Sequence, residues 1–456
     1  MEQYELPDGW VWTTLGEICE VNPGLGWPEN ATEETAISFV PMAAVDDISG
    51  QIVASKPRPI GEVWKGYTRF VDGDIIFARI TPCMENGKAA IATNLVNGIG
   101  TGSTEFHVLR PTDAVLAEWI YHFVRQRSFR DEASRAMTGT AGQLRVPRAF
   151  MEEASIPLAP LPEQLRIADK IEALFEQSRT AREALDAIPA LLRQFRQAVL
   201  AAAFRGELST RDPNDEPASA LLERILDERR RRWEEDLRAR GKDPRRYTYP
   251  EPAPPDTSNL PALPEGWVWV NVGQIADVIG GLTKNSKRQT NSLRLPYLRV
   301  ANVYANELVL DDVQEIGVLE TELERVLLQD GDLLVVEGNG SIDQIGRVAV
   351  WDGSIDPCVH QNHIIKVRFD PVEVSRYALF WLMSSQGRDQ IIRVASSTSG
   401  LYTLSLSKVS ALPIPLAPIS EQRRIIGRLE AFLTLADIFK VSVENARRRL
   451  DRLDQS

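Results

Sequence analysis

The chain is an internal duplication. Four segments of its first half return in the second half at an offset of 257 or 258 residues. A period this long excludes a solenoid, whose repeats span roughly 20 to 50 residues, so each half holds a globular unit of its own. The matching segments are residues 6–18 (LPDGWVWTTLGEI) and 263–275 (LPEGWVWVNVGQI), 72–76 (DGDII) and 330–334 (DGDLL), 140–142 (TAG) and 398–400 (TSG), and 156–167 (IPLAPLPEQLRI) and 414–425 (IPLAPISEQRRI).

The first part of each half has the pattern of a mixed α/β globule, over residues 1–158 and 263–416. Alternating or continuous apolar runs indicate strands, and the Asp-Gly-Asp motif indicates a turn before one of them. One longer amphipathic segment in each globule predicts a helix. The expected strands include residues 10–12, 74–78 and 105–111 with their repeats 267–269, 332–336 and 363–369, and the expected helices cover 114–135 and 375–394.

Each globule is followed by a segment with a heptad pattern, residues 159–205 and 417–456. A long helix with one apolar stripe needs a partner, and the other copy provides it. Because the second helix starts at the second globule, the two must run antiparallel. Pro189 is expected to kink or break the first helix. The predicted seam consists of Ile167, Ile171, Leu174, Leu185, Ile188, Leu192 and Phe195 in the first helix and Ile425, Leu429, Phe432, Phe439, Val443 and Leu450 in the second.

Residues 206–262 join the halves. They contain a charged helical stretch, residues 217–240, and then a tract with five prolines between residues 250 and 261, which predicts a stiff, extended linker. The predicted fold is therefore α+β: two α/β domains joined by two long antiparallel coiled-coil helices in a tandem repeat with pseudo-two-fold symmetry.

The composition excludes several classes of protein. Lysine and arginine number 52 against 64 aspartates and glutamates, a net charge of −12, which argues against a protein that coats nucleic acid without selection. Three cysteines without a Cys-x-x-Cys spacing provide neither a disulfide framework nor a zinc finger. No apolar run reaches the roughly 18 residues of a membrane span and the first residues are acidic, so we expect a cytoplasmic protein.

The sequence also lacks the motifs of adenine methyl transfer, of restriction-type DNA cleavage and of nucleotide binding by a phosphate loop. An adenine methyltransferase needs Asn/Asp-Pro-Pro-aromatic, and no Asn-Pro or Asp-Pro pair here precedes a second proline. No lysine follows an acidic residue at the spacing of a restriction-type nuclease, and no phosphate-binding loop is present. Cys358, His360 and His363 could bind a metal, but we favour a polar groove or turn. For residues 338–346 a hairpin is favoured over a nucleotide loop, and for Arg229 to Arg232 a solvated helix face over a phosphate site.

The repeated motifs, together with residues 196–208 (RQAVLAAAFRGEL), resemble the specificity subunit of type I restriction-modification systems over essentially the whole chain. The resemblance implies two target recognition domains, each reading one half of a split double-stranded DNA site. It also implies conserved spacer helices that hold two methylation subunits, in a complex with two restriction subunits. The subunit itself is then non-catalytic and binds no cofactor or metal, while S-adenosylmethionine, ATP and Mg²⁺ are expected on the partners.

Candidate DNA-binding residues combine basic, amide or hydroxyl side chains with apparent loops. An arginine in such a loop is as often part of a surface ion pair. Residues 1–155 hold 13 basic against 21 acidic side chains, and residues 263–412 hold 13 against 18, so the isolated domains should bind DNA weakly. The candidates are Arg79, Thr138, Thr140, Gln143, Arg145 and Arg148 in the first globule and Lys284, Asn285, Lys287, Arg288, Tyr402, Thr403 and Lys408 in the second.

We therefore expect a DNA-recognition and assembly subunit. Two other functions stay open: a helical protein-interaction scaffold that reads no DNA sequence, and an enzyme with methyltransferase activity of its own.

Overall fold

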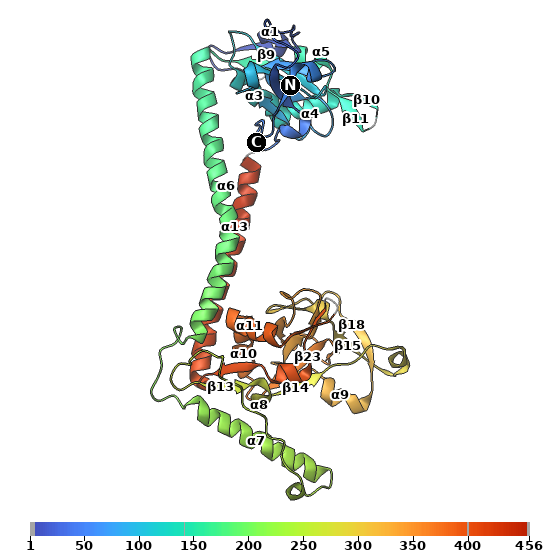
Figure 1. Ribbon diagram of the computed structural model, residues 1–456, viewed down its shortest axis with the longest axis vertical. Coiled ribbons are helices and arrows are strands. Elements are labelled where there is room, and N and C mark those ends of the chain that lie inside the picture. The colour runs from blue at the N-terminus through green and yellow to red at the C-terminus, as the bar shows by residue number, and fades with distance from the viewer. Residues whose placement is uncertain (1–4, 141, 399–400, 454–456) are drawn as a thin grey trace. The chain divides into compact units, whose positions relative to one another are not determined.

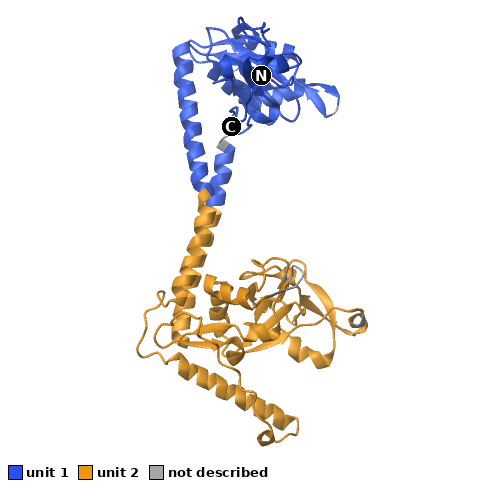
Figure 2. Ribbon diagram, viewed as in Figure 1, with its two compact units in different colours: residues 1–186, 443–456 blue, residues 187–442 orange. Residues whose placement is uncertain are grey.

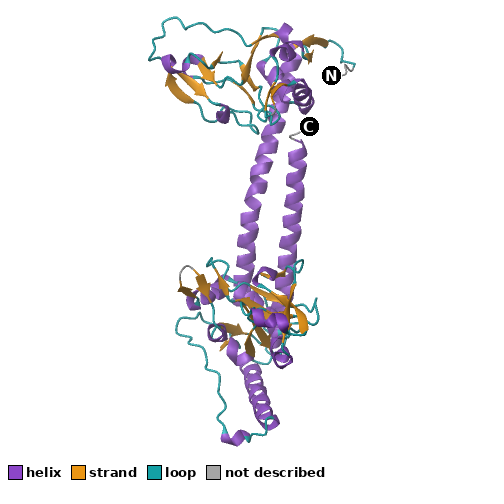
Figure 3. Cartoon of the chain, turned by 90° about the vertical axis from the view of Figure 1, so that its right-hand side faces the viewer, coloured by secondary structure: helices purple, strands orange, loops and turns teal. Residues whose placement is uncertain are grey.

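The computed structural model of the protein describes residues 5–140, 142–398 and 401–453. The chain divides into two compact units, residues 1–186 with 443–456 (unit 1) and residues 187–442 (unit 2), as Figure 2 shows. Each unit contains one mixed α/β globule together with part of both long helices (Figure 3). The predicted fold class is confirmed.

Unit 1 is built on two four-stranded sheets, with strand orders β2-β9-β6-β7 and β4-β3-β8-β5. Only the β3–β8 pair of these sheets is parallel. The first strand of the globule pairs with its last, which brings the two ends of the globule together. The strands are β1 (Val11–Thr14), β2 (Cys19–Val21), β3 (Ala36–Val40), β4 (Lys56–Pro59), β5 (Thr68–Val71), β6 (Ile75–Ala78), β7 (Ala89–Ile91), β8 (Ile99–Gly102), β9 (Phe106–Pro111), β10 (Thr138–Thr140), β11 (Gln143–Arg145) and β12 (Ser155–Leu158).

Unit 2 repeats much of this plan. A four-stranded sheet of order β14-β23-β19-β21 corresponds to β2-β9-β6-β7 of unit 1. Its first and last strands, β13 and β26, pair as β1 and β12 do. The strands are β13 (Val268–Asn271), β14 (Ala276–Gly280), β15 (Leu293–Leu298), β16 (Val303–Tyr304), β17 (Glu307–Leu308), β18 (Gln314–Val318), β19 (Leu333–Val336), β20 (Gly338–Asn339), β21 (Val348–Val350), β22 (Val359–His360), β23 (Ile364–Phe369), β24 (Ser396–Thr398), β25 (Leu401–Thr403) and β26 (Pro413–Leu416).

Short helices cover these sheets. The core of each unit lies between the central four-stranded sheet and a pair of helices, α3 and α4 in unit 1 and α10 and α11 in unit 2. The helices of the globules are α1 (Leu15–Ile18), α2 (Ile60–Val63), α3 (Ala117–Arg125), α4 (Arg127–Ala136), α5 (Arg148–Glu153), α8 (Val272–Ile275), α9 (Glu320–Val326), α10 (Val374–Met383), α11 (Ser385–Val394) and α12 (Leu406–Ser410).

The single helix expected in each globule is in fact two helices. In unit 2 the break falls at Ser384, whose backbone is extended and whose hydroxyl accepts a hydrogen bond from the Gly387 backbone N–H at 3.1 Å. A side chain at Gly387 would meet the Trp381 carbonyl oxygen at 2.0 Å, so the two helices pack closely at this corner. Gln126 is the corresponding extended residue in unit 1. The sequence prediction missed both corners because the apolar periodicity continues through them.

A buried ion pair occurs at the same place in both globules. The Asp74 carboxylate accepts two hydrogen bonds from the Arg110 guanidinium, both at 2.8 Å. Asp332 and Arg368, 258 residues further on, repeat the pair at 2.7 and 2.6 Å. Both aspartates are fully buried, and each is the second aspartate of the Asp-Gly-Asp motif. The motif therefore anchors the central sheet through its carboxylate as well as forming a turn.

The two long helices are α6 (Leu161–Phe204) and α13 (Ile419–Leu453). Their starts are fixed by repeated contacts to the globules. The Trp10 indole donates to Glu163 at 3.3 Å, and the Trp267 indole donates to Glu421 at 3.0 Å. These contacts explain why the Leu-Pro-x-Gly-Trp and Glu-Gln motifs repeat together, since each tryptophan binds the first turn of the helix after its own globule.

Helix α6 runs through Pro189 without a break, so the expectation of a broken helix is wrong (Figure 1). Proline has no N–H with which to bond the carbonyl four residues earlier. In this chain that carbonyl belongs to Leu185, and it accepts a hydrogen bond from the Arg447 guanidinium at 3.4 Å. A side chain of α13 thus replaces the missing donor.

Ion pairs within each unit show that α6 and α13 run antiparallel. In unit 1 Arg182 pairs with Asp451 at 2.6 Å, and Arg447 pairs with Asp186 at 2.5 Å. In unit 2 Arg196 of α6 pairs with Asp437 of α13 at 2.5 Å. Residue numbers rise along one helix as they fall along the other.

The side chains of the predicted seam are buried along only part of the two helices. Ile425, Leu429 and Val443 are buried. By contrast, Leu174 is 51% exposed and Phe439 is 54% exposed, so neither side chain is enclosed as expected. Leu174 lies two turns before Arg182, which already pairs with Asp451 near the last described turn of α13. No described residue of α13 is therefore left to cover it.

The remaining seam residues are partly or mostly covered, and none of them is fully buried. Phe195 and Phe432, each just over one-third exposed, meet edge to face with ring centroids 6.2 Å apart. Partly buried positions on the same stripe are Ile167, Ile171, Leu185, Ile188, Leu192 and Leu450.

The charged stretch of the linker forms α7 (Ala218–Ala239), as predicted, and packs on unit 2 through Ala218, Leu221 and Ile225. Its arginine run forms ion pairs, including Arg229 with Asp277 at 2.9 Å. The proline-rich tract after it contains the short 3₁₀ turn η3 (Pro244–Arg246) at its start and otherwise lacks helices and strands. No helix of the described part of the chain is long and apolar enough to cross a membrane.

Candidate nucleic-acid interface

A two-stranded hairpin, β10–β11, projects from the body of unit 1 (Figure 1). It carries three of the predicted DNA-binding residues, Thr138, Thr140 and Gln143, and all three are exposed. The repeat places β24–β25 at the same position in unit 2, where β20 joins as a third strand. Tyr402 and Thr403 lie on this second hairpin and are half-buried, whereas Ser399 and Gly400 of the repeated Thr-x-Gly motif lie outside the described residues.

Two predicted arginines of unit 1 meet on one carboxylate at the base of the β10–β11 hairpin. Glu105 accepts hydrogen bonds from Arg145 at 2.7 to 3.1 Å and from the Nε of Arg79 at 3.3 Å. The hydrogen bonds from Arg145 are the main reason why the pKa of the Glu105 carboxyl lies below its usual value. The carboxylate thus remains charged and holds both guanidinium groups in place.

The other predicted arginines are also paired. Arg148 is exposed and forms an ion pair with Glu152, four residues on, at 2.8 Å. Arg288 is 14% exposed and pairs with Glu322 at 2.8 and 2.9 Å. Its guanidinium also donates to the carbonyls of Thr283 and Gly317. All of its nitrogens are engaged, so Arg288 orders the loop and is not free to bind DNA.

Four further candidates lie near Arg288 or on α12. Lys284 and Asn285 are exposed, and the Asn285 side chain accepts a hydrogen bond from the Arg288 backbone N–H at 3.2 Å. Lys287 follows in the 3₁₀ helix η4 (Ser286–Thr290), but its side chain lies outside the described residues. Lys408 is half-buried on α12.

Sequence reasoning missed a pair of residues in unit 2. The His363 Nδ1 lies 2.9 Å from Glu337 Oε2, and because a carboxylate accepts, the imidazole donates. Both residues stand 258 positions after Arg79 and Glu105, so the repeat offset could have revealed them.

The other members of the Cys358 to His363 group do not converge on a shared site. His360 is fully buried and its Nδ1 lies 2.8 Å from the Ile364 carbonyl oxygen. Burial lowers the pKa of His360 to about 3, which keeps the ring neutral. Within the described ranges no group of three or more His, Cys, Asp or Glu side chains could hold a metal ion.

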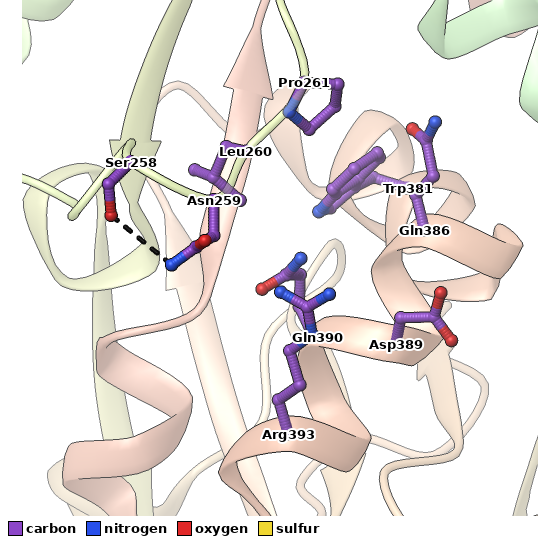
Figure 4. Close-up of a pocket in the computed structure, with 9 residues that line it drawn as sticks. All are labelled: Ser258, Asn259, Leu260, Pro261, Trp381, Gln386, Asp389, Gln390 and Arg393. Carbon is purple, nitrogen blue, oxygen red and sulfur yellow. Dashed lines mark hydrogen bonds between the residues drawn. The ribbon is translucent and has the colours of Figure 1, made fainter.

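A hollow of about 500 Å³ lies between the linker and helices α10 and α11 of unit 2 (Figure 4). Asp389 and Arg393 provide its charged groups, and the Trp381 indole forms one wall. The lining side chains include neither a nucleophile next to a base nor a cluster of metal ligands. It is lined by Ser258, Asn259, Leu260, Pro261, Trp381, Gln386, Asp389, Gln390 and Arg393.

The sequence matches a known family model twice. The model of the type I restriction modification DNA specificity domain covers residues 7–190 and again residues 264–445. A relative from Escherichia coli, the type I restriction enzyme EcoAI specificity subunit, is 32% identical over an alignment that covers 97% of this chain and 81% of the relative. The EcoEI specificity subunit of the same species is 29% identical with the same coverage.

Two solved structures share the fold. The HsdS subunit from Thermoanaerobacter tengcongensis has a TM-score of 0.62 and 20% identity, covering 100% of this chain and 96% of its own. A chain from a structural study of the assembly and conformational transition of the type I R-M system has a TM-score of 0.60 and 21% identity, covering 99% and 97%. At these identities the likeness concerns the fold alone.

Proposed function

The chain belongs to the family of type I restriction-modification DNA specificity subunits, and on that basis we propose that it reads a bipartite, asymmetric site on double-stranded DNA. In this proposal residues 1–158 and 263–416 are the two target recognition domains. Residues 159–205 and 417–456 are the spacer helices, and residues 206–262 join the two halves.

One observation carries the proposal: the two globules share a backbone plan but differ in side chains at the hairpins. Where unit 1 has Arg79, Glu105 and Arg145, unit 2 has Glu337, His363 and Thr403. Two readers of similar fold and different chemistry suit a site whose halves differ in sequence. The exposed hairpin residues Thr138, Thr140 and Gln143 are the strongest contact candidates in unit 1, and Lys284, Asn285 and Tyr402 are those in unit 2.

The exposed apolar side chains of the long helices support partner binding. Such side chains on a protein surface commonly mark an interface. Val199, Leu200 and Phe204 belong to the core of unit 2 and are not part of this surface. We propose that the remaining surface binds two methylation subunits, and that the complex recruits two restriction subunits. The exposed residues are Leu165, Phe175 and Leu191 on α6 and Leu435, Ile438 and Val441 on α13.

Specificity subunits are non-catalytic as a family. We propose accordingly that S-adenosylmethionine, ATP and Mg²⁺ bind to the partner subunits, and that the complex works in the cytoplasm as a DNA adenine methyltransferase and ATP-dependent endonuclease. A scaffold that reads no DNA sequence is disfavoured, because such a protein would not need the two elaborate recognition domains.

A methyl-transfer assay tests the division of labour. The purified chain, given labelled S-adenosylmethionine and duplex DNA, should transfer no label above background. Addition of the methylation subunit should restore transfer, and only to duplexes that carry the recognised site. The same reaction with a methylation subunit that carries an active-site substitution controls for contaminating activity. Label transferred by the isolated chain would show that it is itself the enzyme.

A further inference from the structure

The Arg79 and Glu337 sites occupy the same position in the two repeated folds. The Arg79 backbone N–H donates to the Glu105 carbonyl at 2.9 Å, and the Glu337 N–H donates to the His363 carbonyl at 2.9 Å. The chain returns to each site through the hairpin that follows. There the Val146 N–H donates to the Arg79 carbonyl at 2.8 Å, and the Leu404 N–H to the Glu337 carbonyl at 2.7 Å. The backbone therefore presents the two side chains in the same way.

Arg79 is held by one nitrogen only. Its Nε lies 3.3 Å from Glu105, and its two terminal amino groups form no hydrogen bond with the described residues. Arg145, by contrast, uses Nε and Nη2 on Glu105 and Nη1 on the Gln143 carbonyl. Arg145 is thus fully engaged as a support, whereas Arg79 keeps its donor pair available. Its side chain is 34% exposed, so the donors can be reached.

The free end of Arg79 matches the edge of one base. Two adjacent amino groups of a guanidinium bind O6 and N7 of guanine in the major groove, the commonest specific contact between proteins and DNA. A carboxylate that fixes the guanidinium from behind reduces the entropy lost on binding. Two arginines on one glutamate also leave a net positive charge, which favours approach to a phosphate backbone.

The Glu337 site in unit 2 has the opposite charge and the opposite hydrogen-bonding character. Glu337 is held through Oε2 by His363, and its Oε1 forms no hydrogen bond with the described residues. An acidic side chain in the major groove accepts from the N4 amino group of cytosine. Thr403, which stands where unit 1 has Arg145, brings no second cation. This site therefore presents an acceptor where the first presents donors.

We propose that Arg79 reads the guanine of a G·C pair in one half-site and that Glu337 reads the cytosine of a G·C pair in the other. Glu105, Arg145 and His363 are positioning residues that aim these two side chains. The inference rests on the proposed function, because it assigns base contacts within a DNA-reading surface.

The test uses the complete complex with its methylation subunits and sequences the methylated sites of each variant. Arg79→Ala should lower discrimination at one G·C position of one half-site by about tenfold to a hundredfold and leave the other half-site unchanged. Glu337→Gln should do the same at one position of the other half-site. Arg127→Ala, which removes an exposed arginine in the first turn of α4 that pairs with Asp131, should leave the whole motif unchanged.

Arg79→Lys separates base reading from phosphate binding. A lysine keeps the charge but loses the paired donors, so it should relax the same position as Arg79→Ala if Arg79 reads guanine. If Arg79 binds a phosphate, alanine should weaken all sequences equally and lysine should restore binding. That pattern, or an unchanged motif in assembled Arg79→Ala and Glu337→Gln complexes, would overturn the inference.

A failure of the proposed function would give a different methylation result. In that case the complex with the unaltered chain would methylate no defined motif at all. If Arg79→Ala fails to assemble with its partners, the Arg79→Lys and Glu337→Gln complexes decide the question.

Discussion

Exchange of residues 263–412 for the matching segment of a relative should change one half of the methylated motif and leave the other half intact. The exchanged segment begins at one repeated motif and ends just before another, and it contains most of the core of unit 2. Each wrong base pair in a specific site costs about 1 to 3 kcal/mol, so a new half-site of several bases should reduce methylation at the old sites by more than a thousandfold.

The reciprocal exchange is the matched control. Replacement of residues 6–155 from the same relative should change the other half of the motif and preserve the first. If either exchange altered both halves together, the two globules would not be independent readers. The measurement is sequencing of methylated sites in cells that carry each chimaera and the same methylation subunit.

Val443→Asp should abolish assembly of the complex and leave no motif to measure. Val443 is 7% exposed and lies one turn before Arg447, whose guanidinium pairs with Asp186 on α6. An unpaired carboxylate buried at this place should lower the free energy of unfolding by about 3 to 5 kcal/mol. Thermal unfolding and co-purification with the methylation subunit measure the two effects.

The same helix offers a matched control two residues earlier. Val441 is 54% exposed, so Val441→Asp has the same intrinsic effect on the helix without burying a charge. Its stability should change by less than about 1 kcal/mol. Because Val441 belongs to the proposed partner surface, its complex can weaken while the chain stays folded. An assembled Val443→Asp complex with a new motif would contradict the role given to the helix pair.

Much of the fold could be predicted because its motifs occur twice in the sequence. The offset of about 258 residues located both globules and both long helices. The contact between Trp267 and Glu421 emerged only from the structure. Local sequence patterns were less informative where two helices meet. The corner at Ser384 interrupts a helix without interrupting its apolar periodicity, and Pro189 is tolerated because Arg447 supplies a donor from the other helix.

The candidate site was harder to predict because its contacts join distant parts of the chain. Arg79 and Arg145 were candidates from the sequence, but Glu105 was not, because the contacts among the three residues require the folded sheet and hairpin. Arg288 lies in a loop whose composition suits DNA binding, yet its guanidinium is engaged by Glu322 and by nearby carbonyls. Residue type and position in a loop therefore identify the region that can bind DNA. Whether each side chain is free to do so depends on its contacts with neighbouring residues.

We propose that this chain gives a methylation complex its DNA sequence preference. The most direct measurement is sequencing of methylated bases across the genome in cells with the gene, without it, and with the gene restored. We expect a motif of two unlike halves around a gap of fixed length, which is lost on deletion of the gene and recovered on its restoration. An identical set of methylated sites with and without the gene would show that this chain does not determine the sequence preference.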